Sequence, residues 1–241
     1  MYIAQTNSTN TILREMIAKG EPPAFVRAGY QTAGRGQAGN GWESEREKNL
    51  LCSILIEKQR IDTASLFYLN VAVSVAVRRV LGEDFTIKWP NDIYWQDKKI
   101  AGILIENAII GSEIKYSIAG IGLNVNQTEF VSDAPNPVSL KQITGKDYNI
   151  DELMQSVYDE VQKTLQSNVW EEYKTYLYRR KGFWPFVERE VSTEPTMNAT
   201  LDTPAQFMAR IEDITPQGEL VLVDINHQTR TYHFKQIRFV L

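Results

Sequence analysis

A glycine-rich stretch between two apolar runs constrains the fold of this chain more than any other segment. Gly34, Gly36 and Gly39 in the sequence GRGQAGNGW have the G-x-G-x-x-G spacing that allows a backbone to approach a pyrophosphate closely. In dinucleotide-binding folds this loop leads from a strand into a helix, whose N-terminus faces the phosphates. Two possibilities are open at this point: a dinucleotide site, or a loop that holds another phosphorylated ligand.

The residues that flank the loop favour the second possibility. Residues 24–30 and 49–57 both have the pattern of strands, and the polar residues after the loop show no helical apolar periodicity. Glu57 lies near the spacing expected of a ribose-binding acid, which keeps a dinucleotide site as an alternative. A P-loop is excluded because the sequence contains no G-x-x-x-x-G-K-[ST] pattern. We therefore expect a loop that joins two strands.

The rest of the sequence predicts an α+β fold with two domains. The Ser8-Thr9-Asn10 cluster offers N-cap side chains for a first helix that Gly20 can end. Further helices are predicted at residues 63–81, 151–166 and 170–181. Strands are predicted at residues 86–89, 99–107 and 113–124, with a turn at Pro90-Asn91-Asp92 between the first two.

The C-terminal part changes character and predicts a small β-barrel. Short alternating runs that read as strands lie at residues 199–201, 207–211, 220–223 and 231–234, with a tight turn at Pro216-Gln217-Gly218. We therefore expect a larger domain at residues 1–184 and a barrel domain at residues 185–241.

Composition excludes several classes of function. The formal net charge of −4 gives no general attraction to nucleic acid or to an anionic membrane surface. The sequence contains neither a secretory leader nor an apolar run long enough to cross a membrane. Cys52 is the single cysteine, so no intramolecular disulfide can form and a reducing compartment is favoured. We expect a cytoplasmic protein.

Polar residues in three segments next to apolar strands suggest that the chain binds a phosphorylated ligand. Arg35 supplies a fixed charge within the glycine loop, where backbone N–H groups can also face an anion. Asn91 and Asp92 offer two oxygen ligands suited to Mg²⁺, although an Asn-Asp pair after proline is also common in turns. Asn124, in the run GIGLNVN, can form hydrogen bonds with the edge of a purine, and Lys99 can point either to solvent or into a pocket.

Taken in order, these segments resemble the biotin protein ligases. The resemblance rests on the STN cluster at residue 8, YQTAGRG at residues 30–36 with Trp42, KWPND at residues 88–92, KIAG at residues 99–102, and GIGLNVN at residues 120–126. It covers nearly the whole chain. It implies a fold like that of the class II aminoacyl-tRNA synthetases, with a mixed sheet, flanking helices and an SH3-like C-terminal barrel.

The resemblance also implies a reaction in two steps. Biotin's carboxylate attacks the α-phosphorus of ATP, with Mg²⁺, to give biotinyl-5′-adenylate and pyrophosphate. A lysine of a biotin carboxyl carrier protein, such as the acetyl-CoA carboxylase subunit, then attacks the adenylate and releases AMP. The residues implied are Arg35, Lys99 and Asp92 for catalysis; Ser8, Thr9, Gln31, Gly34, Arg35, Lys99 and Gly102 for biotin; Gly36, Trp42 and Asn124 for the adenylate; and Asn91 and Asp92 for the metal.

Two departures from the family pattern refine this expectation. Gln37 and Asn40 stand where members often carry basic residues, so the loop has fewer charges to hold an adenylate. The STN cluster begins at residue 8, which leaves no room for the winged helix-turn-helix of some bacterial members. We therefore expect a monofunctional ligase without DNA binding, as a monomer or a homodimer. The alternatives are a lipoate protein ligase and a catalytically silent biotin-binding regulatory module.

Overall fold

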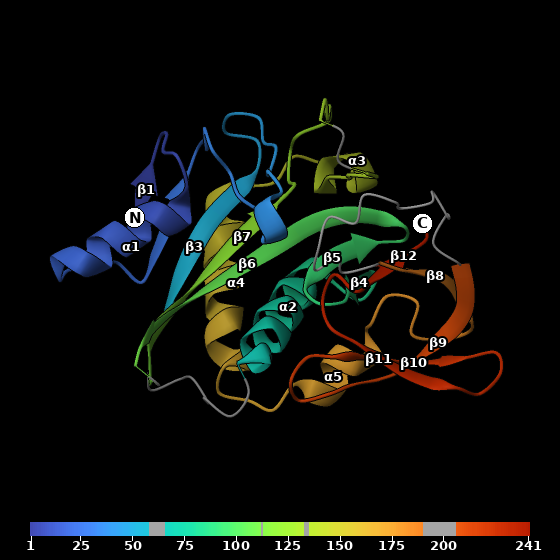
Figure 1. Cartoon of the computed structure of the whole chain (residues 1–241). Coiled ribbons are helices and arrows are strands. Elements are labelled where there is room, and N and C mark those ends of the chain that lie inside the picture. Colours follow the sequence, from blue (N-terminus) through green and yellow to red (C-terminus); the bar gives the residue numbers. More distant parts are fainter. Residues whose placement is uncertain (58–65, 112, 133–134, 190–205) are drawn as a thin grey trace, which may run out of the picture.

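The computed structural model describes residues 1–57, 66–111, 113–132, 135–189 and 206–241. Its larger sheet has seven strands in the order β1-β2-β3-β7-β6-β5-β4, and only the β1–β2 pair is parallel (Figure 1). These strands are β1 (Tyr2–Ile3), β2 (Phe25–Ala28), β3 (Leu50–Glu57), β4 (Phe85–Lys88), β5 (Asp92–Trp95), β6 (Lys98–Ile110) and β7 (Glu113–Leu123).

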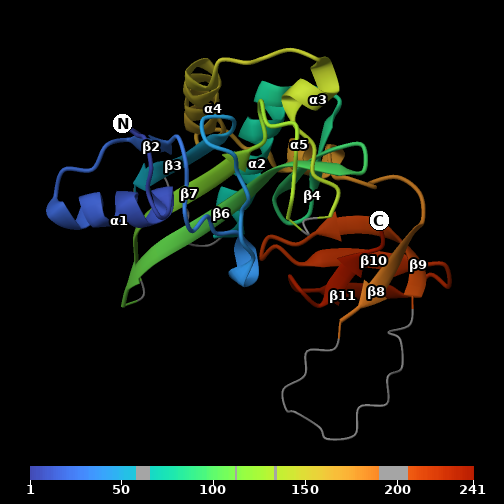
Figure 2. The same ribbon diagram turned by 90° about the horizontal axis from the view of Figure 1, so that it is seen from above.

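Helices cover both faces of this sheet. Helix α1 (Thr9–Lys19) packs on one face, where Leu13 forms a small apolar cluster with Val26 and Ile118. Helices α2 (Phe67–Leu81) and α4 (Ile150–Thr164) lie together on the opposite face (Figure 2). The short helices α3 (Leu140–Thr144) and α5 (Trp170–Thr175) follow β7 and α4 in the chain. The sheet therefore separates the main core from the face that α1 covers.

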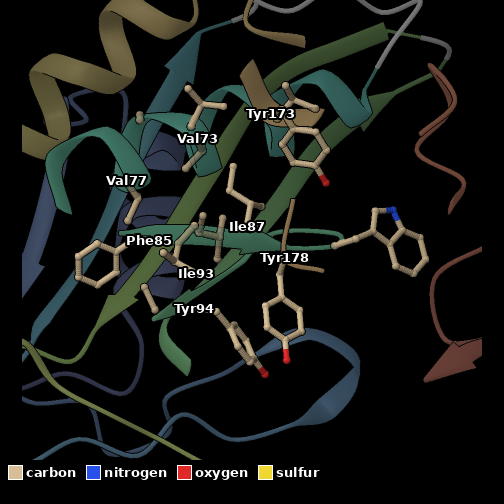
Figure 3. Packing of buried hydrophobic residues seen from close by; sticks show 14 of the residues in the cluster. Val73, Val77, Phe85, Ile87, Ile93, Tyr94, Tyr173 and Tyr178 are labelled. Atoms are coloured by element: carbon tan, nitrogen blue, oxygen red, sulfur yellow. The ribbon is translucent and has the colours of Figure 1, made fainter. Parts of the chain in front are cut away.

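The main core explains why α2 is apolar nearly all round. Val73 and Val77 of α2 are fully buried in one cluster with Ile87 and Ile93 of the β4–β5 hairpin (Figure 3). Cys52 of β3 is buried in the same cluster, and its burial raises the pKa of the thiol to about 12. Cys52 is thus a free thiol within the core.

A second, antiparallel sheet forms the C-terminal part. Its strands are β8 (Trp184–Glu188), β9 (Gln206–Ile214), β10 (Leu220–Asp224), β11 (Thr229–Tyr232) and β12 (Ile237–Phe239), in the order β11-β10-β9-β8-β12. It touches the rest of the molecule through specific bonds: Trp89 Nε1 donates to Gly218 O at 2.9 Å, and Lys174 Nζ lies 2.8 Å from Asp213 Oδ1. The C-terminal sheet thus contacts the loop that follows β4.

Several predicted boundaries differ from the structure. Helix α5 ends at Thr175 rather than near residue 181, because the chain after it pairs with β4: Ile87 N donates to Tyr176 O, and Tyr178 N donates to Ile87 O, both at 2.8 Å. The turn at Pro90 leads into β5, a strand that the sequence analysis missed. The strand predicted at residues 199–201 lies outside the described residues.

Helix α1 begins and ends where predicted, but its cap is different. Ser8 occupies the N-cap position, and its side chain makes no capping hydrogen bond. Gly20 ends the helix in the left-handed conformation, with φ of 94°. Within the described ranges, no helix combines the length and the apolar character that a membrane crossing requires.

Candidate functional site

A strip of glycines lies on the α1-facing side of the large sheet. Gly102 of β6 is paired with Gly122 of β7, and Gly120, two residues before Gly122, is paired with Ser53 of β3. Because side chains alternate along a strand, Gly102, Gly120 and Gly122 all present hydrogen atoms to the same face. These three residues, called here the glycine strip, form a floor without side chains.

The side chains of Trp42 and Asn10 lie directly on this strip, and Lys99 borders it at Gly102. A Cβ atom at Gly122 would overlap the indole of Trp42, and one at Gly102 would come within 2.9 Å of the same ring. A Cβ atom at Gly120 would lie 2.5 Å from Asn10 Oδ1. Glycine is therefore required at these positions, because the Trp42 and Asn10 side chains approach the backbone too closely for a Cβ atom.

The glycine loop folds as a tight hairpin over the strip. Trp42 N donates to Gly34 O at 3.0 Å, Gly36 N donates to Asn40 O at 2.7 Å, and a single 3₁₀ turn, η1 (Gln37–Gly39), forms its tip. The next regular element is strand β3, so the prediction of a loop between strands is confirmed. This connection is incompatible with a dinucleotide-binding loop, which needs a helix there.

The N-terminal cluster forms a buried polar network at one end of the strip. Thr9 donates from both N and Oγ1 to Gln31 Oε1, at 2.8 and 3.1 Å. Ser53 Oγ lies 2.7 Å from Thr9 Oγ1 and 2.5 Å from Asn10 Oδ1, and Asn10 Nδ2 donates to Glu106 at 2.7 Å. This network fixes hydroxyl and amide groups at the sheet surface, which suits recognition of a small polar ligand edge.

The charged residues divide into two groups. Lys99 Nζ lies 2.7 Å from Asp92 Oδ1 and 5.7 Å from the centre of the Trp42 ring. Arg35 turns instead toward α1, where Nη2 donates to Thr11 Oγ1 at 3.2 Å and lies 3.5 Å from Glu106 Oε1. The structure therefore brings Lys99, Asp92 and Trp42 together, while the guanidinium of Arg35 lies beside the N-terminal network.

Lys88 adds a further amine to the first group. It donates a hydrogen bond to Tyr94 Oη at 3.0 Å, and it stands opposite Asp92 in the β4–β5 register. Burial lowers the pKa of Lys88 to about 8; Asp92 opposes this shift, whereas Lys99 adds to it. Lys88 belongs to the KWPND motif, and the sequence alone predicted no role for its amine.

Two buried polar atoms near the strip have no hydrogen-bond partner within the described part of the chain. They are the indole Nε1 of Trp42 and Oδ1 of Asn124. The other end of the Asn124 amide is fixed, because Nδ2 donates to Val138 O at 3.1 Å. An unpartnered buried polar atom is costly, so these two atoms are available to a ligand that supplies an acceptor and a donor.

The predicted metal ligands differ in their freedom to bind Mg²⁺. Asp92 is partly exposed and keeps a second carboxylate oxygen beside its bond to Lys99, which fits an ion held mainly by phosphates and one carboxylate. Asn91 is 1% exposed; its Oδ1 accepts from Gln37 at 3.0 Å and its Nδ2 donates to Asn70 at 2.6 Å. Within the described residues no group of three or more His, Cys, Asp or Glu side chains could hold a metal. The geometry favours Asp92 over Asn91.

Sequence reasoning missed some residues of this site. Ser53 and Glu106 complete the N-terminal network, and Gln37 binds the turn at Asn91. Ser53 could have been found from the sequence, because it is the one polar residue inside the strand run LLCSILI. Glu106 lies on the same face of β6 as Gly102 and Leu104, because alternate residues of a strand share a face. Glu106 can therefore be assigned to the site once Gly102 is known to form its floor.

Comparisons with known proteins agree with this arrangement. BirA of Escherichia coli, a bifunctional ligase/repressor, is 30% identical over 122 residues, covering 49% of this chain and 38% of that protein. The biotin acetyl-CoA-carboxylase ligase of Mycobacterium tuberculosis is 32% identical over 147 residues, covering 57% of this chain and 53% of that protein. The chain thus spans about half the length of the curated relatives it matches.

The fold has a close counterpart among solved structures. Biotin protein ligase from Aquifex aeolicus, in complex with biotin and ATP, matches with a TM-score of 0.75 and 21% identity, over 100% of this chain and 98% of that one. This likeness confirms the predicted fold, a mixed sheet with flanking helices and a C-terminal β module. The model of the biotin/lipoate A/B protein ligase family matches residues 2–124, which include the glycine loop, the glycine strip and Asn124. The chain therefore belongs to the biotin/lipoate A/B protein ligase family.

Proposed function

We propose that the chain is a biotin protein ligase, which activates biotin as biotinyl-5′-adenylate and transfers it to a lysine of a carrier protein. The observation that carries this proposal is the glycine strip, with a hydrogen-bonding network at one end and the Lys99–Asp92 pair at the other. The Mycobacterium tuberculosis relative is a biotin acetyl-CoA-carboxylase ligase, and the biotin protein ligase from Aquifex aeolicus was solved with biotin and ATP.

The ligand chemistry matches the two ends of the site. Biotin has an apolar bicycle and a polar ureido edge, which needs a few directed hydrogen bonds in an otherwise apolar pocket. We assign this edge to Ser8, Thr9 and Gln31, together with the backbone at Gly34 and Gly102. Trp42 offers an aromatic face and an Nε1 donor to the adenylate, and Asn124 Oδ1 offers an acceptor for the amino group of adenine.

The first step brings a carboxylate toward a polyphosphate, so it requires positive charge. Lys99 is the amine nearest to the strip, and we assign it to the carboxylate and α-phosphate oxygens. We assign the same task to Arg35, which must exchange its contacts with Thr11 and Glu106 for ligand oxygens. Mg²⁺ neutralises phosphate charge when bound with ATP, and Asp92 is the side chain that fits it.

The second step requires a neutral lysine amine on the acceptor. A free lysine with a pKa near 10.4 is less than about 0.1% neutral at pH 7, so a nearby proton acceptor accelerates the attack. We assign this role to Asp92, whose carboxylate is held by Lys99. The acceptor is a biotin carboxyl carrier domain, the natural source of such a lysine in this family.

The direct test is exchange of radioactive pyrophosphate into ATP in the presence of magnesium. Three reactions at equal protein concentration contain biotin, lipoate or neither acid. Exchange that depends on biotin supports the proposal. Exchange that depends on lipoate identifies the other branch of the family, and biotin binding without exchange in any reaction identifies a silent binding module.

A further inference from the structure

The glycine loop is fastened to the body of the protein by a chain of three side-chain amides. Gln37, at the tip of the loop, donates from Nε2 to Asn91 Oδ1 at 3.0 Å. Asn91 donates from Nδ2 to Asn70 Oδ1 at 2.6 Å, and Asn70 lies in the first turns of α2. This amide chain, Gln37–Asn91–Asn70, connects the loop, the turn before β5 and a core helix.

The amide chain is directional and its central member is buried. Asn91 is 1% exposed, and both ends of its amide are used. Loss of the Gln37 donor leaves a buried carbonyl oxygen without its partner, which is costlier than losing an exposed hydrogen bond. The position of the loop tip is therefore tied to an amide that has no freedom to turn toward solvent.

The two segments joined by this chain carry the chemistry of the site. The loop carries Trp42 at its end, and Asp92 follows Asn91 directly. We infer that Gln37 is a positioning residue, which holds the glycine loop closed over the strip and thereby slows the release of biotin and of the adenylate. This inference rests on the proposed function for the identity of the ligand, although the amide chain itself does not depend on it.

The contact made by Gln37 affects loop closure rather than the reaction itself. Because Gln37 carries no charge, its contact with Asn91 is a neutral hydrogen bond within the protein. If closure of the loop depends on this hydrogen bond, its loss lowers the fraction of molecules with a closed loop. The apparent affinity for the ligand then falls by the same factor. Chemistry within the closed complex is unaffected.

The test uses Gln37→Met, which keeps the length of the side chain and removes its donor. We expect the KM for biotin and the release rate of preformed adenylate to rise about fivefold, the usual worth of one net hydrogen bond, with kcat for pyrophosphate exchange within about twofold of the original. Asn40→Ala is the matched control, because Asn40 lies in the same loop with an exposed side chain. An unchanged release rate, or a loss confined to kcat, would overturn the inference.

Variants at Asn70 distinguish the amide chain from a direct contact between Gln37 and the ligand. Asn70→Ala removes the acceptor for Asn91 and should act in the same direction as Gln37→Met, whereas Asn70→Asp keeps an acceptor and should retain slow release. The double variant Gln37→Met/Asn70→Ala should release adenylate no faster than Gln37→Met alone. Additive effects of the two changes would contradict a single chain.

A measurement without any ligand separates this inference from the proposed function. Amide hydrogen exchange of residues 34–42 should accelerate in Gln37→Met and remain unchanged in Asn40→Ala. If loop exchange is faster in Gln37→Met but the original chain has no ligase activity, the proposed function is refuted. The inference that the amide chain holds the loop is then still supported. Ligase activity together with unchanged loop exchange would refute the role of Gln37 alone.

Discussion

The absence of a Cβ atom at individual glycines determines the shape of the site. At Gly122 a Cβ atom would occupy the space of the Trp42 indole, and at Gly120 it would collide with the amide of Asn10. Each glycine therefore specifies a contact made by a distant part of the chain. The roles of the polar residues around the strip likewise depend on their position, because their side chains must lie on the same face of the sheet as the strip.

Gly122→Ala should remove activity without unfolding the protein. The new methyl group displaces Trp42 from the strip, so biotin-dependent pyrophosphate exchange should fall by at least about tenfold, whereas alanine in a strand is compatible with the backbone. Gly41→Ala is the control, because its Cβ would meet only Gly34 O, at 3.9 Å. Equal exchange rates in the two variants, at similar melting temperatures, would show that Trp42 is not needed on the strip.

Asp92→Asn should separate the two half-reactions. The variant keeps the size of the side chain but loses the proton acceptor, so single-turnover transfer from preformed adenylate to carrier lysine should slow about a hundredfold. Adenylate formation should slow less, and raising the pH should partly restore transfer because more of the lysine amine is neutral. If formation and transfer fall by the same factor, Asp92 is not the proton acceptor, and its part in metal binding or in holding Lys99 accounts for the whole loss.

At the scale of elements, the β4–β5 hairpin concentrates charge within an apolar environment. Lys88 leaves β4 opposite Asp92, and its amine reaches Tyr94 two residues further along β5. The main core lies against the same hairpin through Ile87 and Ile93, both fully buried. A short hairpin of this kind presents its turn and its charged side chains to the site while its other face anchors it.

Lys88→Met should stabilise the fold in a manner that depends on pH. The folded pKa of about 8 lies below the ordinary value of 10.5, so below pH 8 the charged amine lowers the free energy of unfolding by up to about 3 kcal/mol. As the pH rises from 8 to 10.5 the folded amine is neutralised first, and this penalty disappears. Allowing for the lost Tyr94 bond, we expect a gain of about 1–2 kcal/mol at pH 7, measured by urea unfolding. A gain of the same size at pH 7 and at pH 10.5 would contradict the shifted pKa.

Sequence patterns predicted the long elements and the loop but not the short ones. Strands β3, β6 and β7 and helices α2 and α4 have clear periodicity, and their positions are confirmed to within a few residues. Strand β5 was missed because it follows a proline turn and has only four residues. Residues 176–178 were predicted as the end of a helix, but they pair with Ile87 at the sheet edge. Local pattern does not record such tertiary pairing.

The sequence motifs predicted many residues of the candidate site, but they did not predict the contacts between those residues. Lys99, Asp92, Trp42 and Gly102 were each chosen from the sequence, and the structure brings them together. Ser53 and Glu106 became visible only through strand register, which no single segment encodes. The contacts of Arg35 with Thr11 and Glu106 likewise depend on where α1 lies on the sheet.

At the scale of the whole molecule, the two sheets meet around the turn between β9 and β10. Gly218 in that turn has φ of 89°, and its carbonyl oxygen accepts from Trp89 Nε1 at 2.9 Å. A Cβ atom at this position would overlap the ring of Phe67, which belongs to α2. The C-terminal sheet is thereby held against both the core helix and the residue that precedes the Pro90 turn.

Gly218→Ala should loosen this junction. The left-handed backbone costs alanine about 1–2 kcal/mol, and the displacement of Phe67 adds to this, so we expect a loss of about 2–4 kcal/mol in the free energy of unfolding. Gly145→Ala is the control: its φ is 74° but nothing lies within 4 Å of the added carbon. If both variants lose the same stability by thermal unfolding, the contact with Phe67 contributes nothing.

The bond between Trp89 and Gly218 limits how this protein can be recombined with its relatives. A chimera that takes residues 206–241 from another member of the family replaces the acceptor of the Trp89 indole and the turn against which Phe67 packs. Such a hybrid should fold with the two sheets in contact when Phe67 and Trp89 are taken from the same protein as the turn. Phe67 and Trp89 should therefore be exchanged together with the C-terminal sheet, although they lie more than a hundred residues before Gly218.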